Sequence, residues 1–296
     1  MILVTGGTGF IGSALIRQLA YQGHSVRILL RPSKISPQIP HGVPVEVAVA
    51  ALNDQRGIRA AMKNVDVVFH LIGTERHGSQ ANLNEVEVEG TQAITTVARQ
   101  AGVQRIFFMS HLGADQFSGY PLLKAKGLAE RIIEESQVPF TIFRSGPIFG
   151  PGDQFTTQIL TLIRRTPFFF FNPGGGKTLF QPLWIEDLTT TLTWALDESF
   201  TVNKRYEIGG LEQLTYLKIV KTIMTATKKH RLIIPAPPTV LRSLALFAEQ
   251  SLGGFPISIF WLDQLSVNRI CALDTLPKLL GLLPARFSQH LDYLRS

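Results

Sequence analysis

Three glycines near the start of the chain have a spacing that could place a pyrophosphate against the backbone. Gly6, Gly9 and Gly12 follow a predicted strand at residues 2–5 and lead into a predicted helix at residues 12–22. In such a loop the first glycine allows a tight turn, the second lets the phosphates approach, and the third lets the helix pack closely on the sheet. The helix N-terminus then offers free N–H groups and partial positive charge to the phosphates.

This loop predicts a bound dinucleotide. The context of strand, loop and helix carries the prediction, and a glycine-rich turn without a ligand is the alternative. The residues expected to hold the cofactor here are Gly6, Thr8, Gly9, Phe10, Ile11 and Gly12.

The end of the second predicted strand bears on which dinucleotide binds. A site that prefers NAD usually has a carboxylate there, which binds the ribose 2′-hydroxyl. This chain has Arg31 instead, followed by Ser33 and Lys34. A guanidinium can hold a 2′-phosphate through charge-assisted hydrogen bonds, although an exposed loop arginine is the alternative. We therefore predict NADP(H), with NAD as the second choice. The expected cofactor-binding set is completed by Leu52, Leu71, Ile72 and Gly73.

Strands and helices must alternate to position this loop, and in the first half of the chain they do. Almost wholly apolar runs, of which residues 65–71 are the clearest, are typical of parallel strands covered on both faces. The predicted strands are residues 2–5, 25–30, 43–48, 65–71, 105–110 and 140–144, and the predicted helices are residues 12–22, 54–62, 83–100 and 122–135. This rhythm predicts an α/β fold with a doubly wound parallel sheet, that is, a Rossmann domain.

The pattern changes after residue 150. We predict an NAD(P)-binding domain over residues 1–150, with residues 180–210 returning to it, and a smaller, mostly helical C-terminal lobe over residues 151–296. The run from Phe168 to Phe171 is expected in the core of this lobe, and if exposed it would be a docking patch. Gly174 to Gly176 predict a tight turn rather than a phosphate loop, because Phe171 stands where such a loop needs glycine.

Composition narrows the class of protein. With 45% hydrophobic residues the chain can bury a sizeable core. Cys271 is the single cysteine and the seven histidines show no paired metal spacing, so we expect no metal site. No dense basic run or nucleic-acid-binding signature is present, so no nucleic-acid partner is expected. Because the chain starts with a strand and has no run of about 18 apolar residues, we expect no signal peptide, no spanning helix and a cytoplasmic location.

The net charge of +7 has two interpretations. It is either ordinary solubility charge or an attraction to an anionic cofactor, membrane surface or nucleic acid. The stretch from Leu232 to Trp261 is apolar and interrupted by prolines, and basic amphipathic elements can lie on an anionic membrane without crossing it. We therefore predict that the C-terminal lobe contacts a protein partner in a membrane complex or a membrane surface, which would make the protein peripheral to a membrane.

Short motifs along nearly the whole chain resemble the extended short-chain dehydrogenase/reductase superfamily, which includes NAD-dependent epimerases and dehydratases. They are TGGTGFIG at 5–12, VDVVFHL at 65–71, EGT at 89–91, AGVQR at 101–105, IFGPGD at 148–153 and QPLWIEDL at 181–188. Within it the chain is similar to the atypical branch related to the complex I subunit NDUFA-nine, through MSHL at 109–112, PAPP at 235–238 and DQL at 263–265. The segment YPLLKAK at 120–126 also resembles an NmrA-like branch that assists photosystem assembly.

The resemblance implies a catalytic tyrosine with a lysine four residues later. In members that transfer hydride, the lysine lowers the tyrosine pKa from about 10 and holds the nicotinamide ribose, and the tyrosine transfers the proton. Tyr120 and Lys124 have this spacing, but Pro121 pushes Tyr120 out of the following helix. The resemblance also implies Ser110 as the upstream serine, with His111 or Leu112 as alternatives.

A second register competes with the first. The separation from Lys126 to Arg144 matches the resemblance better than that from Lys124, which puts Lys126 in the lysine place and Leu122 in the tyrosine place. Leu122 cannot transfer a proton. Glu87 also stands where the superfamily has a helix asparagine.

Two functions follow. The favoured one is an NAD(P)(H)-binding protein with weak or absent catalysis, such as an accessory or assembly subunit of a membrane complex. The alternative is an NADP-dependent oxidoreductase or epimerase/dehydratase that uses Tyr120 and Lys124 on an apolar or sugar-nucleotide substrate.

Overall fold

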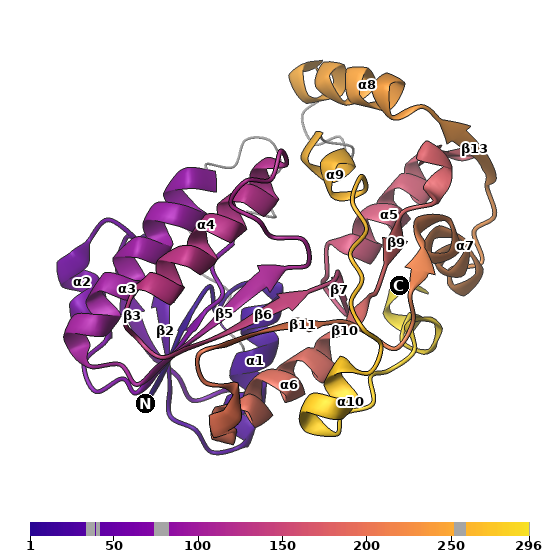
Figure 1. The fold of residues 1–296 in the computed structure, drawn as a ribbon. Coiled ribbons are helices and arrows are strands. Elements are labelled where there is room, and N and C mark those ends of the chain that lie inside the picture. Colours follow the sequence, from indigo (N-terminus) through magenta and orange to yellow (C-terminus); the bar gives the residue numbers. More distant parts are fainter. Residues whose placement is uncertain (34–38, 40–41, 74–82, 252–258, 296) are drawn as a thin grey trace. The chain divides into compact units, whose positions relative to one another are not determined.

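The computed structural model describes residues 1–33, 39, 42–73, 83–251 and 259–295 (Figure 1). Contacts divide the chain into two compact units. Unit 1 comprises the described residues of Met1–Thr74, Asn82–Ser145 and Ile185–Glu207, and unit 2 those of Gly146–Trp184 and Ile208–Ser296. The two units are interleaved along the sequence, so each is described by itself.

Unit 1 is built on a parallel sheet. In the described part of the chain this sheet has seven strands in the order β11-β6-β5-β4-β1-β2-β3. The strands are β1 (Ile2–Thr5), β2 (Val26–Leu30), β3 (Glu46–Val49), β4 (Val67–His70), β5 (Arg105–His111), β6 (Phe140–Ser145) and β11 (Lys204–Ile208). β1 pairs in parallel with both β2 and β4, so the chain reverses its direction of strand addition there. The predicted doubly wound Rossmann fold is confirmed.

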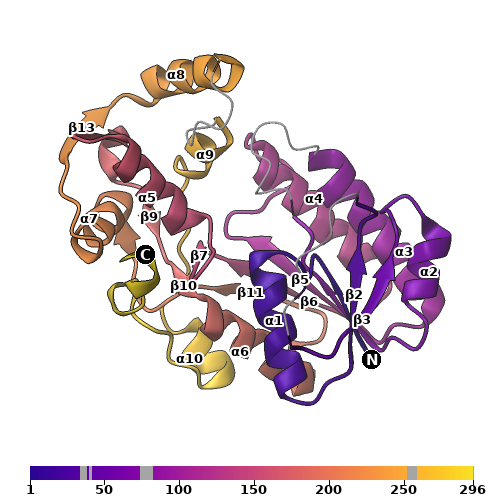
Figure 2. The ribbon, with the colours of Figure 1, turned by 180° about the vertical axis from the view of Figure 1, so that it is seen from behind.

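Helices cover both faces of this sheet, as the two views show (Figures 1 and 2). α1 (Phe10–Tyr21) packs against α6 (Ile185–Asp197), and α2 (Gln55–Ala61), α3 (Gly90–Ala101) and α4 (Pro121–Glu135) pack in sequence against one another. The Asp54 side chain accepts a hydrogen bond from the Gly57 amide and so caps α2. Gly102, with a φ of +72°, ends α3 in the left-handed region. A short 3₁₀ segment, η4 (Ser199–Thr201), follows α6.

The predicted single α-helix over residues 83–100 is wrong in one respect. Its first part, η2 (Asn84–Glu89), is a π-helix, and α3 begins at Gly90. A π segment holds one more residue per turn than the 3.6-residue period, so apolar periodicity does not reveal it. Such segments are frequent at functional sites, and this one contains Glu87.

Unit 2 is mixed and mostly helical. Its helices are α5 (Phe155–Arg165), α7 (Tyr216–Ala226), α8 (Pro238–Ser251), α9 (Ile259–Gln264) and α10 (Thr275–Leu280), with 3₁₀ segments η3 (Gly174–Gly176), η5 (Phe287–Gln289) and η6 (Asp292–Arg295). Its short strands are β7 (Ile148–Phe149), β8 (Phe169–Pro173), β9 (Leu179–Phe180), β10 (Leu183–Trp184), β12 (Leu214–Thr215) and β13 (Leu232–Ala236). The expected tight turn at Gly174–Gly176 is confirmed, since all three glycines have positive φ between β8 and β9.

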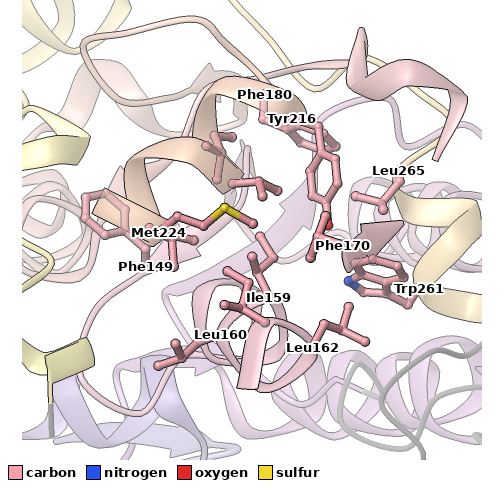
Figure 3. Close-up of a cluster of buried hydrophobic side chains, with 14 of the residues drawn as sticks. Phe149, Ile159, Leu160, Leu162, Phe170, Phe180, Tyr216, Met224, Trp261 and Leu265 are labelled. Carbon is pink, nitrogen blue, oxygen red and sulfur yellow. The ribbon is translucent and has the colours of Figure 1, made fainter. Parts of the chain in front are cut away.

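The core of unit 2 joins segments that are far apart in sequence (Figure 3). Phe149 packs edge-on against Phe287, and Tyr216 contacts the rings of Phe180 and Trp261. These aromatic contacts hold α5, α7 and α9 around one buried cluster, which stabilises unit 2 through apolar burial.

The expectation that the whole aromatic run from Phe168 to Phe171 lies in the core is wrong. Phe170 is 1% exposed, but Phe168, Phe169 and Phe171 are 73%, 45% and 48% exposed. Phe169 and Phe171 face outward because side chains alternate along a strand, and Phe168 precedes the strand. Among the described residues, no helix is long and apolar enough to span a membrane.

Candidate functional site

The loop between β1 and α1 brings two strand ends together. Gly6 has a φ of +74°, and a Cβ added to it would lie 2.7 Å from the carbonyl carbon of Leu71. The Leu71 amide donates to the Thr5 carbonyl and to the Thr5 hydroxyl. The segment from Leu71 to Gly73, which follows β4, therefore lies directly beside the loop. Only glycine combines this φ with so close an approach.

Gly12 and Gly9 have different surroundings. A Cβ on Gly12 would lie 2.3 Å from the Gly6 oxygen and 2.8 Å from the Gly7 Cα, so any side chain would force the helix off the loop. Among the described residues, a Cβ on Gly9 would meet within 4 Å only the Gly6 oxygen, at 3.1 Å. The structure thus separates a packing glycine from one with space beside it that a phosphate could fill. The phosphate contact of Gly9 stays a prediction.

The first turn of α1 is open to a ligand. In the part of the chain that the structure describes, no side chain caps its N-terminus at Gly9. Thr8 is exposed, and Phe10 and Ile11 are half-buried. Uncapped N–H groups and the helix dipole favour an anion at this end.

His70, at the end of β4, bonds through both ring nitrogens to side chains of neighbouring elements. Its Nδ1 lies 2.8 Å from the Thr5 Oγ1, and its Nε2 lies 3.1 Å from the Thr91 Oγ1. The Thr91 hydroxyl itself donates to the Glu87 carbonyl, which leaves it as acceptor toward Nε2. Burial, and next the charge of Lys126, lower the pKa of His70 from 6.5 to about 3. His70 is therefore a neutral, fully bonded part of the structure.

Lys126 is the buried cation of the site. Its Nζ lies 3.0 Å from the Glu87 Oε2, donates to the Met109 carbonyl at 3.2 Å, and lies 5.0 Å from the centre of the Phe108 ring. Both members of the ion pair are almost fully buried. Glu87, which the resemblance places where the superfamily has an asparagine, is thus the carboxylate partner of Lys126.

Tyr120 and Lys124 do not form a comparable pair. Tyr120 precedes α4 with extended backbone angles, φ −93° and ψ 119°, and Pro121 begins the helix, as the sequence predicted. Lys124 is exposed. Among the described residues no hydrogen bond links the two side chains. Leu122 and Lys126 are both buried, one turn apart, so the second register places an aliphatic side chain next to the lysine.

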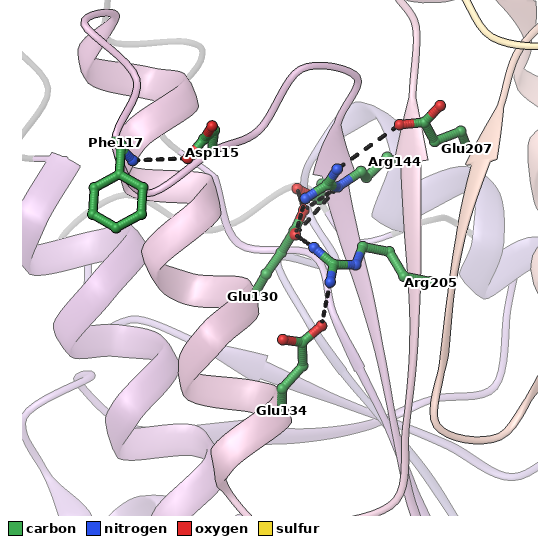
Figure 4. Close-up of polar contacts among 8 residues, drawn as sticks. Asp115, Phe117, Glu130, Glu134, Arg144, Arg205 and Glu207 are labelled. Carbon is green, nitrogen blue, oxygen red and sulfur yellow. Dashed lines mark hydrogen bonds and ion pairs between the residues drawn. The ribbon is translucent and has the colours of Figure 1, made fainter.

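Ser110 belongs to a cluster of polar side chains around the buried Glu130, which Figure 4 shows with its arginine partners. Its hydroxyl donates to the Glu130 Oε1 at 2.5 Å, and Glu130 also accepts from Arg144 and from Arg205. Arg205 makes a further ion pair with Glu134 at 3.0 Å. Burial lowers the pKa of Arg144, but the hydrogen bond and charge of Glu130, together with the charges of Glu207 and Glu134, raise it above its ordinary value. This network joins α4, β5, β6 and β11, and its geometry gives Ser110 a structural partner.

The network also contains residues that sequence reasoning missed. Glu130 was not singled out, although it lies four residues after Lys126 on the same buried face of α4. A charged residue on the apolar face of an amphipathic helix was the available signal. The partner Arg205 could not be found in this way, because it comes from a strand 75 residues later.

The two remaining predicted cofactor-binding residues, Arg31 and Leu52, follow the second and third strands of the sheet. Arg31 follows β2 directly and is exposed. Leu52 packs against the start of α3, since a Cβ on Gly90 would lie 2.9 Å from the Leu52 Cδ1. The structure thus places Leu52 at the end of β3 and Arg31 at the end of β2, on the side of the sheet where the glycine loop also lies.

The parallel sheet with a glycine loop after its first strand defines a Rossmann-type dinucleotide-binding protein. Residues 6–167 match a family model described as NAD(P)H-binding, and the chain belongs to this family. It is an atypical short-chain dehydrogenase/reductase of the NDUFA-nine and NmrA-like branch, which confirms the resemblance found in the sequence.

Three known proteins illustrate the relationship. Subunit 9 of the NADH dehydrogenase (ubiquinone) 1 alpha subcomplex of Arabidopsis thaliana is 26% identical over 279 residues, covering 89% of this chain and 68% of the relative. The photosystem II assembly factor Ycf39 of Synechocystis is 23% identical over 251 residues, covering 84% and 74%. A UDP-glucose 4-epimerase of Thermus thermophilus, solved with NAD, has a TM-score of 0.72 at 19% identity, covering 99% and 97%, and shares the fold.

Proposed function

We propose that this protein is an NADP(H)-binding accessory subunit or assembly factor of a membrane complex, with little or no hydride-transfer activity. One observation carries the catalytic half of the proposal: Lys126 is held in a buried ion pair by Glu87, and Leu122 rather than a tyrosine lies one turn before it. A general acid must reach the substrate oxygen within roughly 3 Å, and an aliphatic side chain has no proton to give.

The residues present fit a dinucleotide. Gly9 leaves room beside an uncapped helix N-terminus, which suits a pyrophosphate. Arg31 is free of a neighbouring acid in sequence and would hold a 2′-phosphate, which is the basis for proposing NADP(H) over NAD(H). Leu52 would lie along the adenine, and the backbone from Leu71 to Gly73 would follow the phosphates. Lys126 would donate to the nicotinamide ribose hydroxyls.

A bound nicotinamide would supply hydride chemistry, but this chain's own residues supply mainly binding. Lys126 already donates to the Met109 carbonyl and pairs with Glu87, so its remaining donor is the one available to a ribose. Its positive charge is balanced at 3.0 Å. Lys126 would therefore stabilise the deprotonated form of a neighbouring hydroxyl less than a lysine without a carboxylate partner would.

The attachment to a membrane complex rests on the relatives. Among these relatives are a complex I subunit and a photosystem II assembly factor, each matched along most of its length. The proposal extends that common role to this chain, with the dinucleotide as a bound structural ligand.

The test compares three variants with the wild type for NADPH affinity and for carbonyl reduction. We expect Tyr120→Phe and Lys124→Ala to change little, and Lys126→Met to weaken NADPH binding. Lys126→Met also leaves Glu87 buried without its cation, which costs about 3–5 kcal/mol. The double variant Glu87→Gln/Lys126→Met removes both charges, so it should recover stability while binding stays weak.

One outcome would favour the second candidate function. Tyr120 is half-buried, and among the described residues a Cβ added to the preceding Gly119 would meet nothing within 4 Å, so the segment has room to move. A wild-type turnover that falls about a hundredfold in Tyr120→Phe, the scale of a lost general acid, would show that Tyr120 and Lys124 form an oxidoreductase or epimerase/dehydratase site.

A further inference from the structure

The outer face of the two-stranded sheet in unit 2 is apolar and exposed. β8 and β13 run parallel, with Phe169 beside Leu232 and Phe171 beside Ile234. Paired residues share a face of the sheet, and alternation places these two pairs on the same face. Leu232 is 63% exposed, and Phe169 and Phe171 are each almost half exposed. We refer to these four residues as the β8–β13 face.

Basic residues gather at the end of the sheet where both strands begin. Arg164 and Arg165 end α5, four residues before β8, and Lys228 and Lys229 follow α7, shortly before β13. Hydrogen bonds bring the two segments together. Arg231 Nε donates to the carbonyls of residues 163 and 166, and the amide of residue 232 donates to the carbonyl of residue 168. Both ribbon views show the end of α5 next to β13 (Figures 1 and 2).

Basic residues outnumber acidic ones in the two segments that form this region. Residues 154–185 contain three Lys or Arg and residues 213–248 contain six, and neither segment contains an Asp or Glu. One of these cations, Arg242, is paired with Asp263 of another segment. An excess of positive charge beside exposed aromatic side chains suits an anionic, apolar counterpart.

We propose that the β8–β13 face docks on an anionic lipid surface. The exposed Phe and Leu side chains would enter the boundary between headgroups and acyl chains, and the surrounding Lys and Arg would bind the anionic headgroups. A lipid surface fits better than a protein partner. Protein interfaces deplete lysine, whereas anionic headgroups form a continuous negative layer that matches several cations at once.

This inference rests on the part of the proposed function that attaches the protein to a membrane complex, and it names the surface that touches the lipid. Vesicles without any protein complex separate the two ideas. A protein that binds its complex but no vesicle keeps the proposed function and loses this inference.

The experiment is flotation of the full chain with vesicles of phosphatidylcholine alone and with one third phosphatidylglycerol. We expect binding to the anionic vesicles and little to the neutral ones, weakening as salt rises. Phe169→Ser/Phe171→Ser should reduce the apparent affinity at least tenfold, because two partly inserted rings are lost. Arg164→Gln/Arg165→Gln/Lys228→Gln should reduce it by about fivefold for each charge removed.

Matched controls lie on unit 1. Phe117→Ser/Phe200→Ser removes two exposed rings, and Arg17→Gln/Lys63→Gln/Lys204→Gln removes three exposed charges. Both should bind vesicles like the wild type, and NADPH titration of every variant checks that unit 1 stays folded. Equal binding to both vesicle types, no vesicle binding, or equal losses in the control variants would overturn the proposal. A dimer that becomes monomeric in Phe169→Ser/Phe171→Ser without vesicle binding would also overturn it and assign the face to self-association.

Discussion

At the scale of single residues, burial decides what a charged or titratable side chain can do in this protein. Lys126 and His70 are both buried, but Lys126 forms an ion pair with Glu87 whereas burial keeps His70 neutral. Arg31, by contrast, is exposed and available to a ligand phosphate. The next two predictions concern these residues.

Arg31→Ala should weaken NADP(H) far more than NAD(H). A lost charge-assisted hydrogen bond costs about 1.5–3 kcal/mol, which is roughly tenfold or more in affinity. Calorimetric titration of both cofactors measures the two constants, with Lys63→Ala as an exposed-charge control. If the wild type binds the two dinucleotides equally, the assigned role of Arg31 is wrong.

His70 should make the free energy of unfolding depend on pH below 6.5. Its folded pKa of about 3 lies below the unfolded value of 6.5, so the unfolded chain binds more protons between these limits. The stabilisation is complete above pH 6.5 and is lost as the pH falls toward 3. Urea unfolding at pH 7.5, 6 and 5 should therefore show a shallower pH dependence in His70→Asn, by up to about one proton. The exposed His230→Asn should keep the wild-type slope; identical slopes in all three proteins would refute a neutral buried His70.

At the scale of elements, Gly9 and Gly12 have different surroundings in the loop and helix after β1, although they look alike in sequence. Gly12 touches the Gly6 oxygen and Gly7, whereas Gly9 is open on its outer side. The π-helix η2 and helix α4 form the second such pair of elements. η2 contributes Glu87 and α4 contributes Lys126 to the buried ion pair. In both cases the backbone geometry sets which residues contact one another.

Gly9→Val should abolish dinucleotide binding with a nearly unchanged melting temperature. Its backbone, φ −75° and ψ 171°, is ordinary extended backbone that valine adopts, and its side chain would fill the space needed by the pyrophosphate. Gly12→Val should instead lower stability by about 1–3 kcal/mol or more, since it overpacks a backbone contact. Thermal melts and NADPH titration of both variants test the split. Normal cofactor affinity in Gly9→Val would mean that the loop is assigned in the wrong register.

At the scale of the whole molecule, the sequence predicted the alternating strands and helices of the sheet, but it did not predict which polar side chains pair with each other. The doubly wound sheet was predictable because apolar strands and amphipathic helices repeat with fixed periods. The sequence predicts that residues 180–210 return to the NAD(P)-binding domain, but it does not predict that residues 204–208 form β11 at the edge of the sheet beside β6. The ion pair of Glu87 with Lys126, and Ser110 bound to Glu130, were not predictable, because periodicity does not say which polar residues meet across a fold.

The last residues of the chain are attached in the same unforeseen way. The Tyr293 hydroxyl donates to the Asp153 Oδ2 at 2.7 Å and lies 2.8 Å from the Thr156 Oγ1, across 140 residues of sequence. Burial, more than any other cause, raises the pKa of both Asp153 and Tyr293.

Tyr293→Phe should therefore destabilise unit 2 by about 1.5–3 kcal/mol, since it removes a hydrogen bond to a buried carboxylate. Chemical unfolding followed by tryptophan fluorescence measures this loss, because Trp184 lies 6.3 Å from the Tyr293 ring, centre to centre. NADPH affinity should stay unchanged, and the exposed Tyr21→Phe should behave as the wild type. Unaltered stability in Tyr293→Phe would show that the C-terminal segment is not anchored through this bond.

The interleaving of the two units has a consequence for synthesis on the ribosome. The first six strands of the sheet are complete at Ser145, but α6, which packs against α1, ends at residue 197, and β11 joins the sheet edge only afterwards. All of residues 146–184, which belong to unit 2, leave the ribosome in between. A nascent chain therefore carries a nearly finished nucleotide fold with one apolar helix face uncovered while about 50 further residues are translated. At roughly 5–20 residues per second this lasts several seconds, during which we expect that face to be open to a chaperone.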